Sequence, residues 1–362
     1  MLPVGFWTNE PGRAQKLEGN RWSQAVMFGQ TGEITDDRFE RRGPQPVTPG
    51  EFARLLTDRI DAGEKLLLAF DVDGTLVPFH REVKDARMTA GESGRFVRLA
   101  QLTQQRFGTP LSVITGRAFD DVLEGLGGES VLKGQPVVIV TDQGLRNFDC
   151  ATWHEITTPE TAPLTEKAKA LHDALRPFME TVANADNGFV NPEYKAGGIA
   201  INTASASPDL TAQASEKFLA VGRELGLLPA DTEALGQSGE FTLVHENAAL
   251  EMKPRTFNKG NAMRGLKEAY LKDGGVSFFV GDAPTDNAAL SEADYSLFVG
   301  KPVRPVTAKY MLPNEKHTEG ADCETPDGQV DHEKRTAISR QNTEAVHAML
   351  ADLMQHLERK AP

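Results

Sequence analysis

The chain has 362 residues, of which 39% are hydrophobic, and its formal net charge is −13. This length and apolar content are enough for a full α/β core together with a second, smaller domain. The strong negative charge argues against a nucleic-acid partner or an anionic membrane surface, because both require a basic binding face.

Two other features of the composition limit the compartment. Cys150 and Cys323 are too few for a disulfide framework and do not have the spacing of a zinc site. The first seven residues lack the basic and apolar regions of a secretory signal, and no apolar run is long enough to span a bilayer. We therefore expect a cytoplasmic protein without a membrane partner.

The first predicted elements lie after an N-terminal extension, residues 1–46, whose sequence is mixed and rich in glycine. A helix is predicted to start near Pro49, because Thr48 and Glu51 have the spacing of a capping box and proline is favoured in the first turn. The helix leads into the apolar run at residues 66–70, which is typical of a strand buried on both faces of a parallel sheet.

Two acids follow this strand directly, Asp71 and Asp73, and Gly74 and Thr75 come after them. Open α/β sheets bind ligands at the carboxyl ends of their strands. The pair is therefore a candidate for Mg²⁺ binding and for nucleophilic and proton-transfer chemistry. The alternative is an Asx-Gly turn with two solvated acids, since a short motif alone is weakly specific.

A crossover helix leads to a second apolar strand at residues 110–114, which ends in Thr115, Gly116 and Arg117. A further strand is predicted at residues 137–140. Taken alone, Thr115 is typical of a helix N-cap, and Arg117 of a partner for an acid on its own helix.

The pattern changes between residues 153 and 250. Helices are predicted at about 164–183 and 210–226, and strands at 198–203 and 241–245. This alternation predicts an inserted α/β cap domain. Residues 47–152 and 251–362 would then form a discontinuous core.

A lysine and two further acids follow the insertion. Lys259 opens a segment with apolar residues at helical spacing, and a third apolar strand at residues 276–280 ends in a segment with Asp282, Asp286 and Asn287. Individually, the lysine would be solvated and the acids would cap a helix. Three buried strands that each end in chemically capable residues are not the pattern of scattered surface charge.

The C-terminal part combines an irregular segment with a helix. Residues 314–336 are polar and without periodicity, which predicts a segment without regular structure. His317, Cys323 and His332 within it match no metal-site spacing. The apolar stripe at residues 346–357 predicts a helix docked on the core or on a second copy, so we expect a monomer or a homodimer.

Four motifs in this order resemble the haloacid dehalogenase-like (HAD) superfamily of phosphohydrolases. They are DxDGT at residues 71–75, the threonine after the second strand, the lysine before Gly260, and GDxxxDN at residues 281–287. The resemblance covers roughly residues 64 to 300. It implies a Rossmann-like parallel sheet core with an inserted smaller α/β cap domain of the C2B type.

The resemblance also implies a role for each catalytic residue. Asp71 would attack phosphorus and form an aspartyl-phosphate, and Asp73 would protonate the leaving oxygen and then activate water. Thr115 would donate a hydrogen bond to a phosphate oxygen. Lys259 would neutralise charge on the same group.

Mg²⁺ is the cofactor that the resemblance implies. Its ligands would be Asp71, the backbone carbonyl of Asp73 and Asp282, with Asp286 as a further ligand or as the residue that orients the lysine. Asn287 would support the metal shell. Dehalogenases lack the second acid of the first motif, so Asp73 favours a phosphatase or a phosphomutase.

Within the superfamily the chain is most similar to the trehalose-6-phosphate phosphatases. Glu193 and Lys195 resemble that family's Glu-x-Lys segment and would contact sugar hydroxyls, and Gly116 and Arg117 are further candidate substrate contacts. The alternative for the first two is an exposed ion pair beside a strand.

The chain departs from that family at three places. Ala283 and Asn287 stand where the family usually has acids, and Gln143 stands where it usually has histidine. These departures affect the identity of the sugar more than the phosphoryl chemistry.

Three functions therefore remain open. The first is a Mg²⁺-dependent phosphatase that converts trehalose 6-phosphate to trehalose and phosphate. The second is a phosphatase for another sugar phosphate, of the sucrose phosphate, glucosylglycerol phosphate or mannosylphosphoglycerate type, or a phosphomutase. The third is a degenerate regulatory binding protein, against which the intact motif residues argue.

Overall fold

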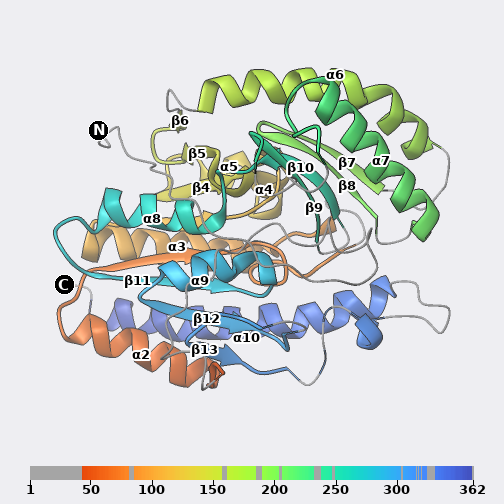
Figure 1. Ribbon diagram of the computed structural model, residues 1–362. Coiled ribbons are helices and arrows are strands. Elements are labelled where there is room, and N and C mark those ends of the chain that lie inside the picture. The colour runs from red at the N-terminus through yellow and green to blue at the C-terminus, as the bar shows by residue number, and fades with distance from the viewer. Residues whose placement is uncertain are drawn as a thin grey trace. The chain divides into compact units, whose positions relative to one another are not determined.

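In the computed structural model the described residues are 43–80, 85–156, 161–184, 190–203, 206–231, 238–246, 249–302, 305–314, 316, 318, 320–323 and 331–360. The predicted N-terminal extension lies outside them except for residues 43–46. The described residues up to Ile156 and from Asn258 onward form one compact unit, and those between 157 and 257 form a second (Figure 1). No helix in the described ranges is long and apolar enough to cross a membrane.

The first unit is built on a nine-stranded sheet with the order β1-β13-β12-β11-β2-β3-β4-β5-β6. Neighbouring strands from β1 to β4 pair in parallel, and β5 and β6 are added antiparallel at one edge. The strands are β1 (Gln45–Pro46), β2 (Leu66–Phe70), β3 (Leu111–Ile114), β4 (Val137–Thr141), β5 (Arg146–Asp149), β6 (His154–Ile156), β11 (Val276–Gly281), β12 (Tyr295–Val299) and β13 (Tyr310–Leu312).

Helices cover both faces of this sheet. One face packs against α2 (Pro49–Asp61), α3 (Ala90–Phe107), α4 (Phe119–Gly125), α5 (Glu129–Leu132) and α10 (His332–Arg359). The other packs against α8 (Lys259–Tyr270) and α9 (Asn287–Glu292). In β2, Leu66, Leu68 and Phe70 belong to the first core, whereas Leu67 and Ala69 belong to the second. The prediction of a strand buried on both faces is therefore confirmed.

Local signals explain where the helices begin. At α2 the Thr48 hydroxyl accepts the Glu51 N–H at 3.2 Å, and the Glu51 carboxylate accepts the Thr48 N–H at 2.7 Å, so the predicted capping box is present. Thr89 and Glu92 form the same box at the start of α3. α8 begins at Lys259 because the Asn258 side chain accepts the Asn261 N–H.

The register of the central strands brings their carboxyl ends to one edge. Phe70 at the end of β2 lies opposite Val280 of β11 and Val113 of β3. The Asp71 N–H then donates to the Val280 carbonyl at 2.9 Å, which fixes the backbone where β2 leaves the sheet. The polar residues after these three strands therefore emerge side by side.

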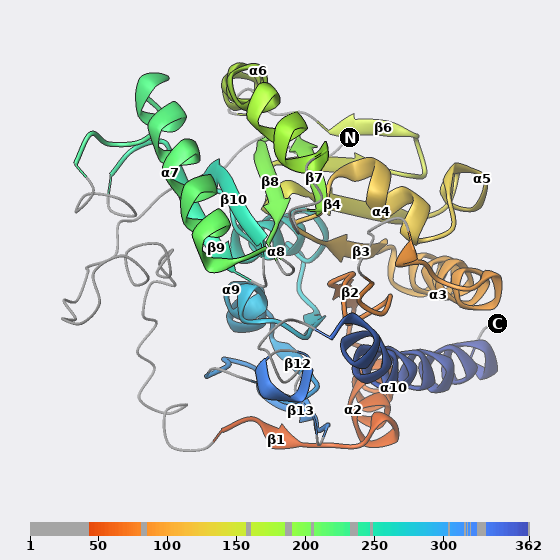
Figure 2. The same ribbon diagram turned by 90° about the vertical axis from the view of Figure 1, so that its right-hand side faces the viewer.

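The second unit is a four-stranded antiparallel sheet with the order β7-β8-β10-β9. Its strands are β7 (Val190–Lys195), β8 (Gly198–Asn202), β9 (Phe241–Glu246) and β10 (Ala249–Pro254). The helices α6 (Thr161–Asn184) and α7 (Pro208–Glu224) lie next to each other on this sheet (Figure 2). The helices and strands predicted between residues 153 and 250 are confirmed.

The C-terminal helix is longer than predicted. α10 starts at His332, where Asp331 accepts the Lys334 N–H at 3.1 Å, so the last part of the segment predicted to be irregular is helical. Residues 320–323 form a short 3₁₀ turn, and residues 324–330 lie outside the described residues. α10 packs along α2 and α3 (Figure 2), which confirms the prediction of a helix docked on the core.

We expect Leu353→Ala to lower the free energy of unfolding by about 2–5 kcal/mol, because Leu353 of α10 is fully buried in the first core and truncation leaves a cavity. Urea unfolding followed by circular dichroism measures this change. The control is Gln341→Ala on the exposed face of α10, for which we expect a change within about 0.5 kcal/mol. Equal effects of the two substitutions would contradict the docking of this helix.

Candidate active site

The centre of the site is a buried lysine between two carboxylates. Lys259 Nζ lies 2.7 Å from Asp71 Oδ1 and 2.6 Å from Asp286 Oδ1, and all three side chains are almost fully buried. Burial alone would lower the pKa of Lys259, but the charges of Asp286 and Asp71 outweigh it and the pKa is raised. The alternative of a solvated lysine is therefore wrong, and Lys259 is a permanent cation of the site.

Asp286 has a second structural task. Its Oδ2 atom accepts the backbone N–H groups of Asp282 at 3.1 Å and Ala283 at 3.0 Å, so it fixes the turn after β11. Asp286 therefore caps this turn, as the capping alternative predicts, and also contacts Lys259. Gly281 is required here because a Cβ atom at this position would lie 2.5 Å from Asp286 Cγ.

Asp71, Asp282 and Asp286 form a group that can hold a metal ion. One oxygen of each carboxylate lies within 4.8 Å of the others, and the Asp282 Oδ1 atom is buried without a hydrogen-bond partner. Burial, with Asp286 as the next cause, raises the pKa of Asp71 to about 7, and burial together with Asp71 raises that of Asp282. Carboxylates that repel one another in a dry site fit a divalent cation, which would relieve this repulsion.

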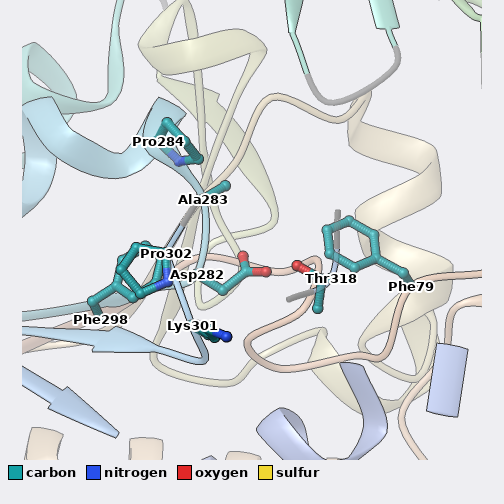
Figure 3. A pocket seen from close by; sticks show the side chains of 8 residues that line it. All are labelled: Phe79, Asp282, Ala283, Pro284, Phe298, Lys301, Pro302 and Thr318. Carbon is teal, nitrogen blue, oxygen red and sulfur yellow. The ribbon is translucent and has the colours of Figure 1, made fainter. Parts of the chain in front are cut away.

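The turn after Asp73 needs glycine because the backbone passes close to Asp282. Gly74 has a φ of +70°, and a Cβ atom there would overlap Asp282 Oδ2 and lie 2.9 Å from Phe79 Cε2. Phe79 and Asp282 also line one pocket, together with Ala283, Pro284, Phe298, Lys301, Pro302 and Thr318. Figure 3 shows the Asp282 carboxylate directed toward the side of this pocket formed by Thr318 and Phe79.

Asp73 is held by Arg117. Arg117 Nε donates to Asp73 Oδ2 at 2.6 Å, and Nη2 donates to Asp73 Oδ1, which is the two-pronged geometry of a strong ion pair. Burial opposes ionisation, but Arg117 outweighs it, and the pKa of Asp73 lies below its ordinary value. Arg117 therefore pairs with an acid that follows β2.

Thr115 lies at the end of β3, buried, and its hydroxyl accepts the Arg117 N–H at 3.2 Å. It does not cap the next helix, because the N-cap of α4 is Ala118. The Thr115 carbonyl accepts the N–H of Gln143, and a Cβ atom at Gly116 would lie 2.5 Å from Gln143 Nε2. Gly116 therefore lies against the Gln143 side chain of the β4–β5 turn.

That turn is strained. Asp142 and Gln143 have φ values of 50° and 59°, in the left-handed region that residues other than glycine rarely adopt. Both side chains are buried. Strained backbone of this kind persists where the surroundings hold it, and it gathers at functional sites.

In the second unit the structure brings Glu193 and Lys195 together with a residue that the sequence analysis missed. Lys195 Nζ lies 2.7 Å from Glu251 Oε1 of β10 and 3.5 Å from Glu193 Oε2. Burial would raise the pKa of Glu251, but Lys195 and Lys253 lower it to about 2. The exposed ion pair considered as the alternative is wrong for Lys195, which is 7% exposed.

One further expectation fails. Asn287 was expected to support the metal shell, but its side chain donates to the Pro305 carbonyl at 3.2 Å and accepts the Thr307 N–H at 3.1 Å. It therefore anchors a loop beside α9. The sequence analysis also did not single out Arg335 and Phe79, which lie next to the turn after Asp73.

No family model matches the chain, and no curated protein matches it significantly. Among solved structures, it is similar to the C-terminal domain of trehalose-6-phosphate phosphatase from Candida albicans (C. albicans), with a TM-score of 0.58, 14% identity and coverage of 86% of this chain and 99% of that one. It is also similar to a trehalose-6-phosphate phosphatase related protein, with a TM-score of 0.50, 16% identity and coverage of 78% and 99%. At these identities the likeness shows a shared fold, and the predicted α/β core with an inserted α/β unit is confirmed.

We expect Glu251→Gln to reduce stability in a pH-dependent way. The pKa of Glu251 falls from an ordinary 4.5 to about 2 on folding, so the stabilisation is complete above pH 4.5 and is lost as the pH falls toward 2. Urea unfolding should show the variant less stable on the order of 3 kcal/mol at pH 7, with about half that difference at pH 3. The exposed Glu180→Gln should change stability by less than about 0.5 kcal/mol at both pH values. A pH-independent difference for Glu251→Gln would refute the assignment.

Proposed function

We propose that this chain, which shares its fold with trehalose-6-phosphate phosphatases, is a Mg²⁺-dependent phosphatase that hydrolyses trehalose 6-phosphate through an aspartyl-phosphate intermediate. The observation that carries the proposal is the buried group of Asp71, Lys259, Asp282 and Asp286 at the carboxyl edge of the parallel sheet. Such a group combines a nucleophile, a fixed cation and a set of metal ligands in one dry site.

Asp71, Asp282 and the backbone carbonyl of Asp73 are the proposed Mg²⁺ ligands, and Asp286 is a ligand or the residue that orients Lys259. The unpartnered Asp282 oxygen and a donor set made only of oxygen atoms fit a hard divalent cation. When bound, this ion supplies positive charge that offsets the negative charge of the phosphoryl group.

Asp71 is the proposed nucleophile, because it directly follows β2, is held there by its own N–H bond to the Val280 carbonyl, and is ion-paired with Lys259. An anionic phosphate monoester repels an attacking carboxylate, and Lys259 reduces that repulsion as a point charge with three donors. Asp286 keeps Lys259 charged and in place. Thr115 is the proposed hydrogen-bond donor to a phosphoryl oxygen.

Asp73 is the proposed general acid and base. Two hydrogen bonds from Arg117 keep the Asp73 carboxylate ionised. At least one of them must break before Asp73 can carry a proton. An arriving substrate offers Arg117 other oxygens and thereby permits the exchange. Arg117 is then both a substrate contact and the residue that controls the proton on Asp73, and Gly116 keeps the backbone next to it compact.

Glu193 and Lys195 are the proposed contacts to sugar hydroxyls. Lys195 is fixed by Glu251 in the antiparallel sheet, so the hydrogen-bonding groups of this cluster are preorganised. A charged, buried cluster of this kind suits a ligand with many hydroxyl groups better than an apolar one.

The direct test is phosphate release from a panel of sugar phosphates with and without Mg²⁺. We expect fast release from trehalose 6-phosphate, its loss after chelation of divalent metal, and a fall of at least about 10³-fold in Asp71→Asn, which removes the nucleophile. The matched control is Asp58→Asn, an exposed acid of α2, which should retain full activity.

Comparable slow release from many phosphates would refute trehalose 6-phosphate as the substrate while keeping the phosphatase. Full activity in Asp71→Asn would refute the nucleophile. Absence of release from every ester would leave a binding protein with this fold.

Asp73→Asn separates the two halves of the reaction. With p-nitrophenyl phosphate, whose leaving group needs no proton, we expect one equivalent of p-nitrophenol per enzyme in a rapid burst, followed by turnover slowed about 10²–10⁴-fold. The slow phase arises because the amide of this variant cannot activate water against the aspartyl-phosphate. Stopped-flow absorbance measures the burst, and slow release without a burst would contradict the role of Asp73 as the base.

A further inference from the structure

Arg335 on α10 is a buried cation that has no acidic partner in the part of the chain that the structure describes. Its side chain is 9% exposed, its guanidinium carbon lies 4.2 Å from the centre of the Phe79 ring, and its Nε atom has no hydrogen-bond partner. Among the residues that the structure describes, no ion pair involves Arg335. A buried N–H such as that of Nε is destabilising when it has no acceptor, which calls for a ligand that supplies one.

The position of Arg335 is fixed by several contacts between α10 and the turn after Asp73. The Ser339 hydroxyl accepts the Phe79 N–H at 2.9 Å, and His347 Nε2 donates to the Leu76 carbonyl at 3.0 Å. Phe79 in turn lies against Gly74 and lines the pocket that contains Asp282 (Figure 3). The guanidinium is therefore held at a defined place beside the reaction centre.

Arg335 also lies close enough to Asp73 to act on it electrostatically, because its charge is one of the causes that lower the pKa of that acid. The Asp73 carboxylate is already engaged by Arg117 through two bonds. Arg335 is therefore not needed to neutralise Asp73.

None of the four carboxylates of Asp71, Asp73, Asp282 and Asp286 is paired with Arg335. Lys259 and Arg117 offset two of them, and a divalent cation would offset the other two. Arg335 therefore adds positive charge on the side of Phe79, which favours an anion there. A planar guanidinium stacked on an aromatic ring is suited to oxyanions, which it binds through parallel hydrogen bonds.

We propose that Arg335 binds an oxyanion of the substrate beside Asp73. This inference rests on the proposed phosphatase function, and it extends the site to a helix at the far end of the chain. The oxyanion belongs to the phosphoryl group that is transferred or, for a substrate other than trehalose 6-phosphate, whose leaving alcohol is neutral, to an anionic group on the leaving alcohol. Both present the same chemistry to the guanidinium.

The experiment compares Arg335→Met and Arg335→Lys with the control Arg359→Met, which removes an exposed arginine from the last turn of the same helix. Binding of inorganic phosphate is measured by isothermal titration calorimetry in the presence of Mg²⁺, which requires no turnover. The kinetic arm compares kcat/KM for 3-phosphoglycerate and glycerol 3-phosphate, which differ by a carboxylate. Thermal unfolding without ligand shows whether each variant is folded.

We expect Arg335→Met to weaken phosphate binding at least tenfold if the phosphoryl group is the partner, with partial recovery in Arg335→Lys. If the leaving group is the partner, phosphate binding is kept and the preference for 3-phosphoglycerate over glycerol 3-phosphate falls at least tenfold. In both cases Arg359→Met behaves like the wild type.

Unchanged phosphate binding and unchanged preference in folded Arg335→Met would overturn the inference, as would a wild-type chain that binds no phosphate. Because Arg335→Met could unfold the helix, Arg335→Lys is the second test, and loss of the melting transition in Arg335→Met with wild-type behaviour in Arg335→Lys would also overturn it. Phosphate binding that depends on Arg335, combined with no release from any ester, would refute only the proposed function.

Discussion

The structure depends on two buried ion pairs that share one lysine: Lys259 is held between Asp71 and Asp286. A lysine ammonium enters a protein interior only when nearby charges and acceptors replace its water, and removing one partner from a buried pair costs about 3–5 kcal/mol. Asp71 directly follows β2, Asp286 ends the 3₁₀ turn after β11, and Lys259 begins α8. The three elements must therefore meet at one edge of the sheet, which the adjacency of β2 and β11 provides.

Three buried carboxylates, those of Asp71, Asp282 and Asp286, surround one buried lysine, so negative charge is in excess. The same crowding constrains the surrounding backbone. Gly74 and Gly281 are needed because no side chain fits between the backbone and the carboxylates of Asp282 and Asp286. The pKa of Asp71 near 7 is the measurable sign of the same crowding. A site with these properties is poorly optimised for stability and well suited to take up a cation, as expected where function and stability compete.

Much of this could be predicted from the sequence, for reasons that are local. The run 66–70, the glycine after Asp73 and the capping box at Thr48 are determined by neighbours within a few residues, so strand, turn and helix start were predicted correctly. Three contacts were not predicted: those of Arg117 with Asp73, of Lys195 with Glu251 and of Phe79 with Ser339. The partners in these contacts are 44, 56 and 260 residues apart along the chain. Charged residues with no periodicity carry no signal for such pairings until the fold brings the segments together.

The segment at residues 314–336, which contains Arg335, is the most informative case, because it was predicted to be irregular. Its helical start depends on Asp331, and its burial depends on packing against the turn after Asp73. Arg117 and Arg335 thus approach Asp73 from different parts of the chain, one directly bonded and one at longer range. Since a guanidinium retains its charge at any physiological pH, two of them beside one acid keep that acid ionised until another anion competes for them. The proposed proton transfer by Asp73 would therefore be tied to occupation of the site, which would limit its chemistry to the moment when a substrate is bound.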